Sequence, residues 1–86
     1  MEVRTFVEEQ VTEIKVRRFL EESFPLVEKI DNDSLLLGTG LLDSLGILEV
    51  VSFLEREFHI IVSDEELVPE NFQTIKAIAA FVVQKA

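Results

Sequence analysis

The stretch that decides the fold is residues 41–58, which read LLDSLGILEVVSFLEREF. Beyond its first residues, large apolar side chains recur at intervals of four, three and four residues, the spacing of one buried helical stripe. The stripe consists of Ile47, Val51, Leu54 and Phe58, with Leu48 and Val50 at its flanks. Helical geometry places four residues on the side of the helix opposite this stripe: Leu45, Glu49, Ser52 and Arg56. We therefore expect a helix over about 44–58 with one apolar residue, Leu45, on its polar face.

The first 24 residues carry two apolar stripes that are out of phase with each other. One stripe is Val3, Val7, Val11 and Ile14, and the other is Val16, Phe19, Leu20 and Phe24. Because one straight helix cannot bury both stripes against one neighbour, we expect the main helix to run from about Thr12, its candidate N-cap, to Ser23. Pro25 fits the end of this helix. We expect residues 2–11 to form an extra turn or short helix folded onto the domain.

The rest of the chain predicts two more helices and a long connection. Residues 25–43 contain turn signals at 31–34 and a glycine pair at 38 and 40, yet they are apolar enough to pack across the helix ends. Ser63 and Glu66 have capping-box spacing, and Pro69 limits the helix that follows them to about two turns. The last helix begins near Thr74 and carries an apolar face. The sequence therefore predicts an all-α, four-helix bundle with a short third helix and a long loop between the first two helices.

Length and composition exclude several classes of function. The 86 residues fit one domain, which we place at 1–86 with an N-terminal extension over about 1–11 and the bundle over 12–84. The absence of cysteine rules out disulfides, thiolate metal sites and cysteine nucleophiles. A net charge of −9 argues against nucleic-acid binding and favours a partner with a basic face. Neither a signal peptide nor a membrane-spanning apolar run is visible, so we expect a soluble cytoplasmic protein without membrane insertion.

Three interpretations of the central segment follow from local chemistry alone. A calcium loop starting at Asp31 fails, because leucines occupy the sixth and twelfth positions, where glycine and glutamate are needed, so a plain turn is favoured. A serine hydrolase needs a base beside Ser44, and the single histidine, His59, lies about four helical turns or roughly 22 Å away. We expect His59 at the surface or at a helix end. The structural interpretation is that Asp43 or Ser44 simply caps the helix.

A fourth interpretation takes the whole pattern together. The segments that carry it are GTGLL at 38–42, DSL at 43–45, EVVSFLEREF at 49–58, VSDEEL at 62–67 and NFQTI at 71–75. In an acidic domain of this size, this pattern resembles the acyl carrier protein family, which includes peptidyl and D-alanyl carrier proteins. The resemblance covers about residues 12–83. DSL alone is a weak motif and becomes specific only with its neighbours.

The resemblance implies a carrier that performs no catalysis. In that family a serine at the position of Ser44 receives 4′-phosphopantetheine from coenzyme A, and an acyl or aminoacyl group then rides on the arm as a thioester. The implied partners are a phosphopantetheinyl transferase, an acyl- or aminoacyl-loading ligase, and downstream acyltransferase or synthase enzymes. The activating base and the metal belong to the transferase. The resemblance also implies a monomer and a place in lipid metabolism such as fatty acid biosynthesis.

Partner recognition is expected to be electrostatic. Residues 43–70 hold eight acids and one base, Arg56, a net −7 of the chain's −9. Carried over by resemblance, Asp43, Leu45 and Glu49 contact the transferase and other partners, although a solvated helix face is the simpler interpretation of Glu49.

The sequence departs from the family pattern in three places on the same helix. Gly46 stands where fatty-acid-synthesis carriers usually have an acid, Ser52 replaces a common apolar contact, and Arg56 interrupts an acidic run. We therefore expect a specialised carrier that serves a dedicated pathway. The alternative from another class is an unmodified acidic helical adaptor that binds proteins through the central helix.

Overall fold

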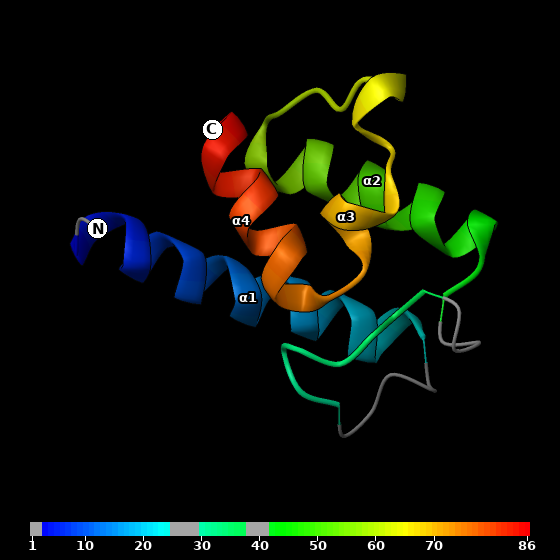
Figure 1. Ribbon diagram of the computed structural model, residues 1–86, viewed down its shortest axis with the longest axis horizontal. Coiled ribbons are helices and arrows are strands. Elements are labelled where there is room, and N and C mark those ends of the chain that lie inside the picture. Colours follow the sequence, from blue (N-terminus) through cyan, green and yellow to red (C-terminus); the bar gives the residue numbers. More distant parts are fainter. Residues whose placement is uncertain (1–2, 25–29, 38–41) are drawn as a thin grey trace.

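The computed structural model describes residues 3–24, 30–37 and 42–86. Along the chain it forms α1 (Val3–Ser23), α2 (Ser44–Phe58), the short 3-10 helix η2 (Asp64–Glu66), α3 (Pro69–Phe72) and α4 (Ile75–Lys85) (Figure 1). Within the described ranges there is no strand, only an isolated bridge between Leu37 and Leu42. The prediction of an all-α fold with four α-helices, the third of them short, is confirmed.

Helix α1 is one continuous helix, so the prediction of a separate N-terminal turn before Thr12 was wrong. Thr12 is no cap: it is buried in mid-helix, and its hydroxyl donates to the Glu8 carbonyl at 2.8 Å. The second apolar stripe faces the core through Val16 and Leu20, whereas the first stripe stays exposed. Figure 1 shows the blue N-terminal half of α1 extending beyond the other helices. The expectation failed because extending an existing helix adds one backbone hydrogen bond per residue, which does not require the added apolar stripe to pack against a neighbour.

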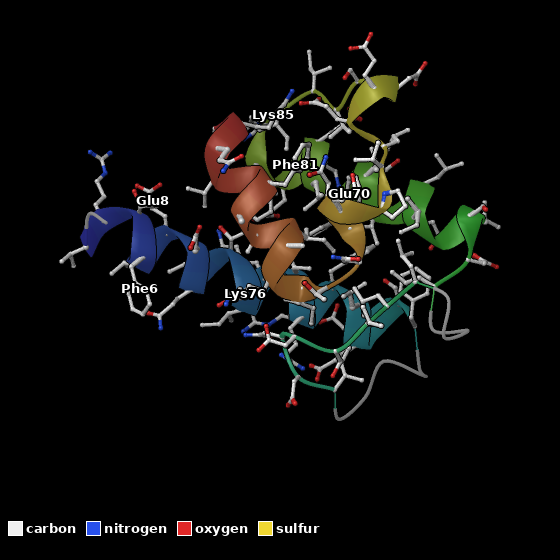
Figure 2. All side chains as sticks on the ribbon, viewed as in Figure 1. Phe6, Glu8, Glu70, Lys76, Phe81 and Lys85 are labelled. Carbon is white, nitrogen blue, oxygen red and sulfur yellow. The ribbon has the colours of Figure 1, made fainter. Side chains whose placement is uncertain are left out.

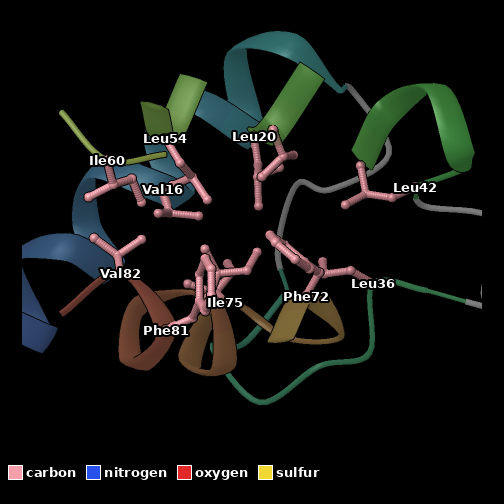
Figure 3. Close-up of a cluster of buried hydrophobic side chains, with 12 residues drawn as sticks. Val16, Leu20, Leu36, Leu42, Leu54, Ile60, Phe72, Ile75, Phe81 and Val82 are labelled. Atoms are coloured by element: carbon pink, nitrogen blue, oxygen red, sulfur yellow. The ribbon is translucent and has the colours of Figure 1, made fainter. Parts of the chain in front are cut away.

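The core lies where α1, α2 and α4 converge, with α3 and the long loop closing its end (Figure 3). Helix α1 packs along α4, and a stacked pair of rings, Phe19 on α1 and Phe53 on α2 with centroids 4.3 Å apart, joins α1 to α2. The buried apolar side chains of this core are Val16, Leu20, Leu36, Leu42, Val50, Leu54, Ile60, Phe72, Ile75, Ile78, Phe81 and Val82.

Helix α2 is rotated from its predicted orientation. Its buried residues are Gly46, Val50 and Leu54, four residues apart, while the predicted Ile47 and Val51 are only half-buried at the edge of this face. The prediction missed Gly46 because a glycine contributes no apolar side chain to a periodicity analysis. In the structure its bare backbone lets the Phe24 ring approach: a Cβ on Gly46 would lie 3.2 Å from Phe24 Cε1.

The described part of the long connection packs across the helix ends, as predicted. Arg17 on α1 donates to the Ile30 carbonyl and to Asn32 Oδ1, both at 2.6 Å. On the other side, the Lys76 N–H donates to the Asn32 carbonyl at 2.9 Å. Leu36 is fully buried between these anchors and the core. Pro25 and the glycines at 38 and 40, which were predicted to end α1 and to form a turn, lie outside the described residues; α1 itself ends at Ser23.

The segment before α4 differs from its prediction. The Ser63 N–H donates to Glu66 Oε1 at 3.0 Å, in the predicted capping-box pairing, but only the 3-10 turn η2 follows and not two helical turns. Pro69 does not end a helix; it occupies the first turn of α3, where its missing N–H costs nothing. Helix α4 begins at Ile75, beside the predicted start near Thr74, and Thr74 is its N-cap, accepting from the Ala77 N–H at 2.9 Å.

Candidate functional site

The start of α2 presents an exposed serine hydroxyl. Asp43 is the N-cap: its Oδ1 accepts a hydrogen bond from the Gly46 N–H at 2.8 Å. Ser44 is the first helical residue and is exposed, and its hydroxyl makes no hydrogen bond to any residue that the structure describes. The sequence did not decide whether Asp43 or Ser44 caps the helix. In the structure Asp43 is the cap, so the Ser44 hydroxyl is not needed for capping.

Buried neighbours on both sides hold Ser44 in place. Leu42, two residues before it, is buried, and its N–H donates to the Leu36 carbonyl at 3.1 Å. Gly46, two residues after it, is buried against Phe24 and Leu42. Because both flanks are anchored in the core and the cap is satisfied, the hydroxyl projects from a rigid helix end.

Two of the residues predicted to contact partners are exposed on α2 after Ser44. Leu45 is 65% exposed, and Glu49 is exposed one turn further along α2. Glu49 borders a groove of about 350 Å³ between α1 and α2. The groove is lined by Phe19, Ser23, Leu48, Glu49, Ser52 and Arg56.

Sequence reasoning missed Leu48, which it placed at the flank of the buried stripe. In the structure Leu48 is 55% exposed and forms one rim of this groove. Its spacing of three residues from Leu45 is the signal that pairs the two on one helix face.

Internal contacts engage several of the acids counted in the sequence. Glu55 Oε2 accepts from the Val62 N–H at 2.9 Å and so ties the segment after α2 back onto the helix. Glu57 lies 3.6 Å from Lys15 on α1. Because these carboxylates have structural partners, the acids left on the exposed face of α2 nearest Ser44 are Asp43 and Glu49.

Glu66, further along the chain, also has an internal partner. Its Oε1 lies 2.8 Å from Lys85 Nζ on α4. This hydrogen bond, followed by the one from the Ser63 N–H, holds the pKa of Glu66 below its ordinary value of 4.5. Its carboxylate therefore fastens η2 to α4.

The residues proposed for competing chemistries do not assemble into a catalytic site. His59 is the exposed C-cap of α2, at the end opposite Ser44, so about 22 Å of helix separates the two. The prediction that His59 lies at a helix end is confirmed. The Asp31 segment forms the predicted turn, closed by the Ser34 N–H on the Asp31 carbonyl at 3.2 Å. In the part of the chain that the structure describes, no group of three or more His, Asp or Glu residues is placed to hold a metal ion.

The start of α2 suits a phosphate ester. The first N–H groups of a helix have no intrahelical acceptor, and the helix dipole places partial positive charge there. Asp43 satisfies only the Gly46 N–H, so the N–H groups of Ser44 and Leu45 remain at the positive helix end. A phosphodiester on the exposed Ser44 hydroxyl would lie beside them.

Comparison with known proteins agrees with this fold and identifies the family. Residues 14–82 match the family model described as a phosphopantetheine attachment site. Two curated relatives align over 70 residues. An acyl carrier protein of Buchnera aphidicola subsp. Baizongia pistaciae is 37% identical, and the alignment covers 80% of this chain and 87% of the relative. Aminoacyl carrier protein 2 of Bradyrhizobium diazoefficiens is 30% identical, and the alignment covers 81% of this chain and 76% of the relative. Among solved structures, the apo form of KstB-PCP superposes with a TM-score of 0.67 at 38% identity, covering 90% of this chain and 87% of that one.

The chain belongs to the phosphopantetheine-attachment family of carrier proteins. Its cofactor is covalently bound 4′-phosphopantetheine, and it is an acyl or aminoacyl carrier that performs no catalysis itself. Carriers of this family work with transferases and synthase enzymes. None of the described helices is long and apolar enough to cross a membrane.

Proposed function

We propose that Ser44 is the residue that carries 4′-phosphopantetheine. The observation that supports this is its geometry: an exposed hydroxyl with no hydrogen-bond partner among the described residues, on the first residue of a rigid helix whose cap is already supplied by Asp43. The attachment forms a P–O bond to Ser44 Oγ, breaks the pyrophosphate P–O bond of coenzyme A with release of adenosine 3′,5′-bisphosphate, and passes the hydroxyl proton to a base of the transferase. Once attached, the arm supplies the thiol that this cysteine-free chain lacks.

The chain's own residues then position and present the arm. The buried neighbours of Ser44, Leu42 and Gly46, fix the point from which the arm swings, and the positive helix end stabilises the phosphodiester. Leu45 offers an apolar anchor to the docked enzyme, and Asp43 and Glu49 orient it through basic groups. Tethering raises the effective concentration of the cargo at each docked enzyme.

We further propose a specialised carrier of a dedicated pathway. Arg56 is exposed at the end of the α1–α2 groove away from Ser44, and Gly46 is buried, so this helix differs in charge and shape from an acidic recognition helix. A loading ligase and an acyltransferase or synthase would be its working partners, and we place it in the cytoplasm. We treat residues 1–86 as one domain, with residues 12–84 as the bundle and about 1–11 as an N-terminal extension.

Mass spectrometry after incubation with coenzyme A and a phosphopantetheinyl transferase tests the attachment. We expect one added phosphopantetheinyl group on the wild-type chain and on Ser52→Ala, a matched change of an exposed serine on the same helix, and none on Ser44→Ala. A chain that stays unmodified with a transferase active on a control carrier would instead favour the adaptor. An added group that persists in Ser44→Ala would place the attachment elsewhere.

A further inference from the structure

The N-terminal half of α1 carries an apolar stripe that the rest of the chain leaves exposed. Val3 is 78% exposed and Ile14 is 58% exposed, and between them Phe6, Val7 and Val11 are each close to half exposed. Figure 2 shows Phe6 and Glu8 on opposite sides of this projecting part of the helix. Contiguous exposed apolar side chains of this size mark an interaction surface.

The spacing of this stripe is that of a coiled-coil seam. Val3, Val7, Gln10 and Ile14 are separated by four, three and four residues, which places them at successive d, a, d and a positions of a heptad. Both a positions are β-branched, a choice typical of two-stranded parallel coils. Residues on the opposite side of α1, among them Thr12 and Val16, are buried against the body of the domain, so the seam is exposed to solvent, although Val7 at its edge also lines a groove with Val83 on α4.

The residues beside the seam complement a second copy of the same helix. In a parallel pair, the g residue of one helix meets the e residue five positions later on the other. Here that rule joins Phe6 to Val11, an apolar pair, and Glu13 to Arg18, an ion pair. An antiparallel pair would instead place g beside g and e beside e, so that Glu13 would face Phe6 and would no longer meet Arg18.

The two charged residues of this arrangement are unpaired within one chain. No salt bridge joins Glu13 or Arg18 to another residue in the described ranges, whereas Lys15 between them pairs with Glu57. Burial, and then the neighbouring Glu9, raise the pKa of Glu13 despite the opposing influence of Lys76 and Arg17, so a further cation close to it would relieve an unfavourable charge.

The seam has a defined end and a polar centre. Arg17, the next d position, is turned onto the loop at Ile30 and Asn32, so the contact stops after about two heptads. Gln10 at the central d position can exchange amide hydrogen bonds with its counterpart, which fixes the register. A coil this short gives weak, reversible pairing.

From these observations we propose that the chain self-associates through α1, forming a parallel, two-fold symmetric dimer. Val3, Val7, Gln10 and Ile14 form its seam, and Phe6–Val11 and Glu13–Arg18 contacts flank it. Helix α2 begins at the end of the molecule away from the projecting part of α1 (Figure 1), so pairing through α1 leaves the start of α2 accessible in both copies. This replaces the monomer expected by resemblance, and it depends on neither the cofactor nor the proposed role of Ser44.

Sedimentation of the purified unmodified chain up to about 1 mM tests the pairing. We expect a concentration-dependent monomer–dimer equilibrium that Ile14→Glu abolishes. The matched control is Ile61→Glu, at an apolar residue that is 81% exposed and lies off α1, and it should leave the equilibrium unchanged. A wild-type chain that stays monomeric at every concentration, or an equal loss of dimer in both variants, would overturn the proposal. If the wild-type chain is monomeric and only Ile14→Glu slows its enzymatic loading, the stripe would instead be a contact surface for an enzyme partner.

Charge reversal and cross-linking test the orientation. Glu13→Arg and Arg18→Glu should each weaken the dimer about tenfold, and the double variant should restore it, because the two symmetric pairs are then opposite in sign again. Since the chain has no cysteine, Val3→Cys should give an oxidised dimer with no background. Additive weakening in the double variant, or cross-linking only between Val3→Cys and Ile14→Cys chains, would rule out the parallel arrangement.

Discussion

The cap at Asp43 provides a quantitative test of how the attachment site is held. Asp43 Oδ1 accepts the Gly46 N–H at 2.8 Å, and removing such a cap costs about 1 kcal/mol. Its charge at the positive helix end adds about 0.5 kcal/mol, near the low end of the usual range because the side chain is exposed. We therefore expect Asp43→Ala to lower the free energy of unfolding by about 1.5 kcal/mol, which for a domain of this size lowers Tm by about 6–12 °C.

Asp43→Asn separates the cap from the charge. Asparagine caps a helix about as well as aspartate, so this variant should lose only the charge contribution, about 0.5 kcal/mol or about 2–4 °C. Urea unfolding and thermal melting measure both variants, with Glu49→Gln, an exposed acid beyond the first turn, as a control that changes stability by less than about 0.5 kcal/mol.

The same variants separate folding from docking. If the Asp43 carboxylate orients the transferase, Asp43→Asn should slow phosphopantetheinylation by more than its small stability loss explains. Equal destabilisation by Asp43→Asn and Asp43→Ala would refute the cap as the main contribution. A variant pair that melts like the wild type would show that the hydrogen bond contributes nothing.

Three further changes test individual features of the fold. His59→Gly should raise the free energy of unfolding by about 0.5 kcal/mol in urea titrations, because His59 has φ 56°, a conformation costly for a side-chain-bearing residue; a lower value would contradict this. Gly46→Asp should cost more than about 2 kcal/mol and slow modification, since it places a carboxylate against Phe24; an unchanged melting curve would show that the space is open. The hydrogen bond to Lys85 lowers the pKa of Glu66, so the stability that this bond provides is present above pH 4.5 and is lost as the pH falls through the lowered pKa. Glu66→Gln should therefore make the free energy of unfolding fall less steeply with decreasing pH. A fall as steep as that of the wild type would assign the acid-induced loss of stability to other groups.

Local patterns were enough to predict the number of helices and several of their ends. The spacing of Val51 and Leu54 predicted α2, and the start of α4 was placed correctly near Thr74. These features depend on residues within one or two turns of each other, and such residues are neighbours in the sequence as well as in space. The candidate serine was identified in the same way, from the motif around Ser44.

Other features depended on contacts between residues distant in sequence. The periodicity of α2 pointed to Ile47 as a core residue, but the Phe24 ring packs over Gly46 and turns the Gly46–Val50 face inward. Count and spacing of acids did not reveal that Glu57 is paired with Lys15 on another helix. Nor did they reveal that α1 continues through Thr12 and leaves its first stripe uncovered.

The amino-acid order by itself determined how many helices form, where α2 and α4 begin, and which hydroxyl stands at a helix start, because these follow from hydrogen bonds and side-chain periodicity within a few residues. Only the tertiary structure decided that Asp43 is the cap and Ser44 is free, since that depends on Leu42 and Gly46 being held by distant partners. It also decided which charges remain available to a partner, because a carboxylate's neighbours in space are set by the packing of whole helices.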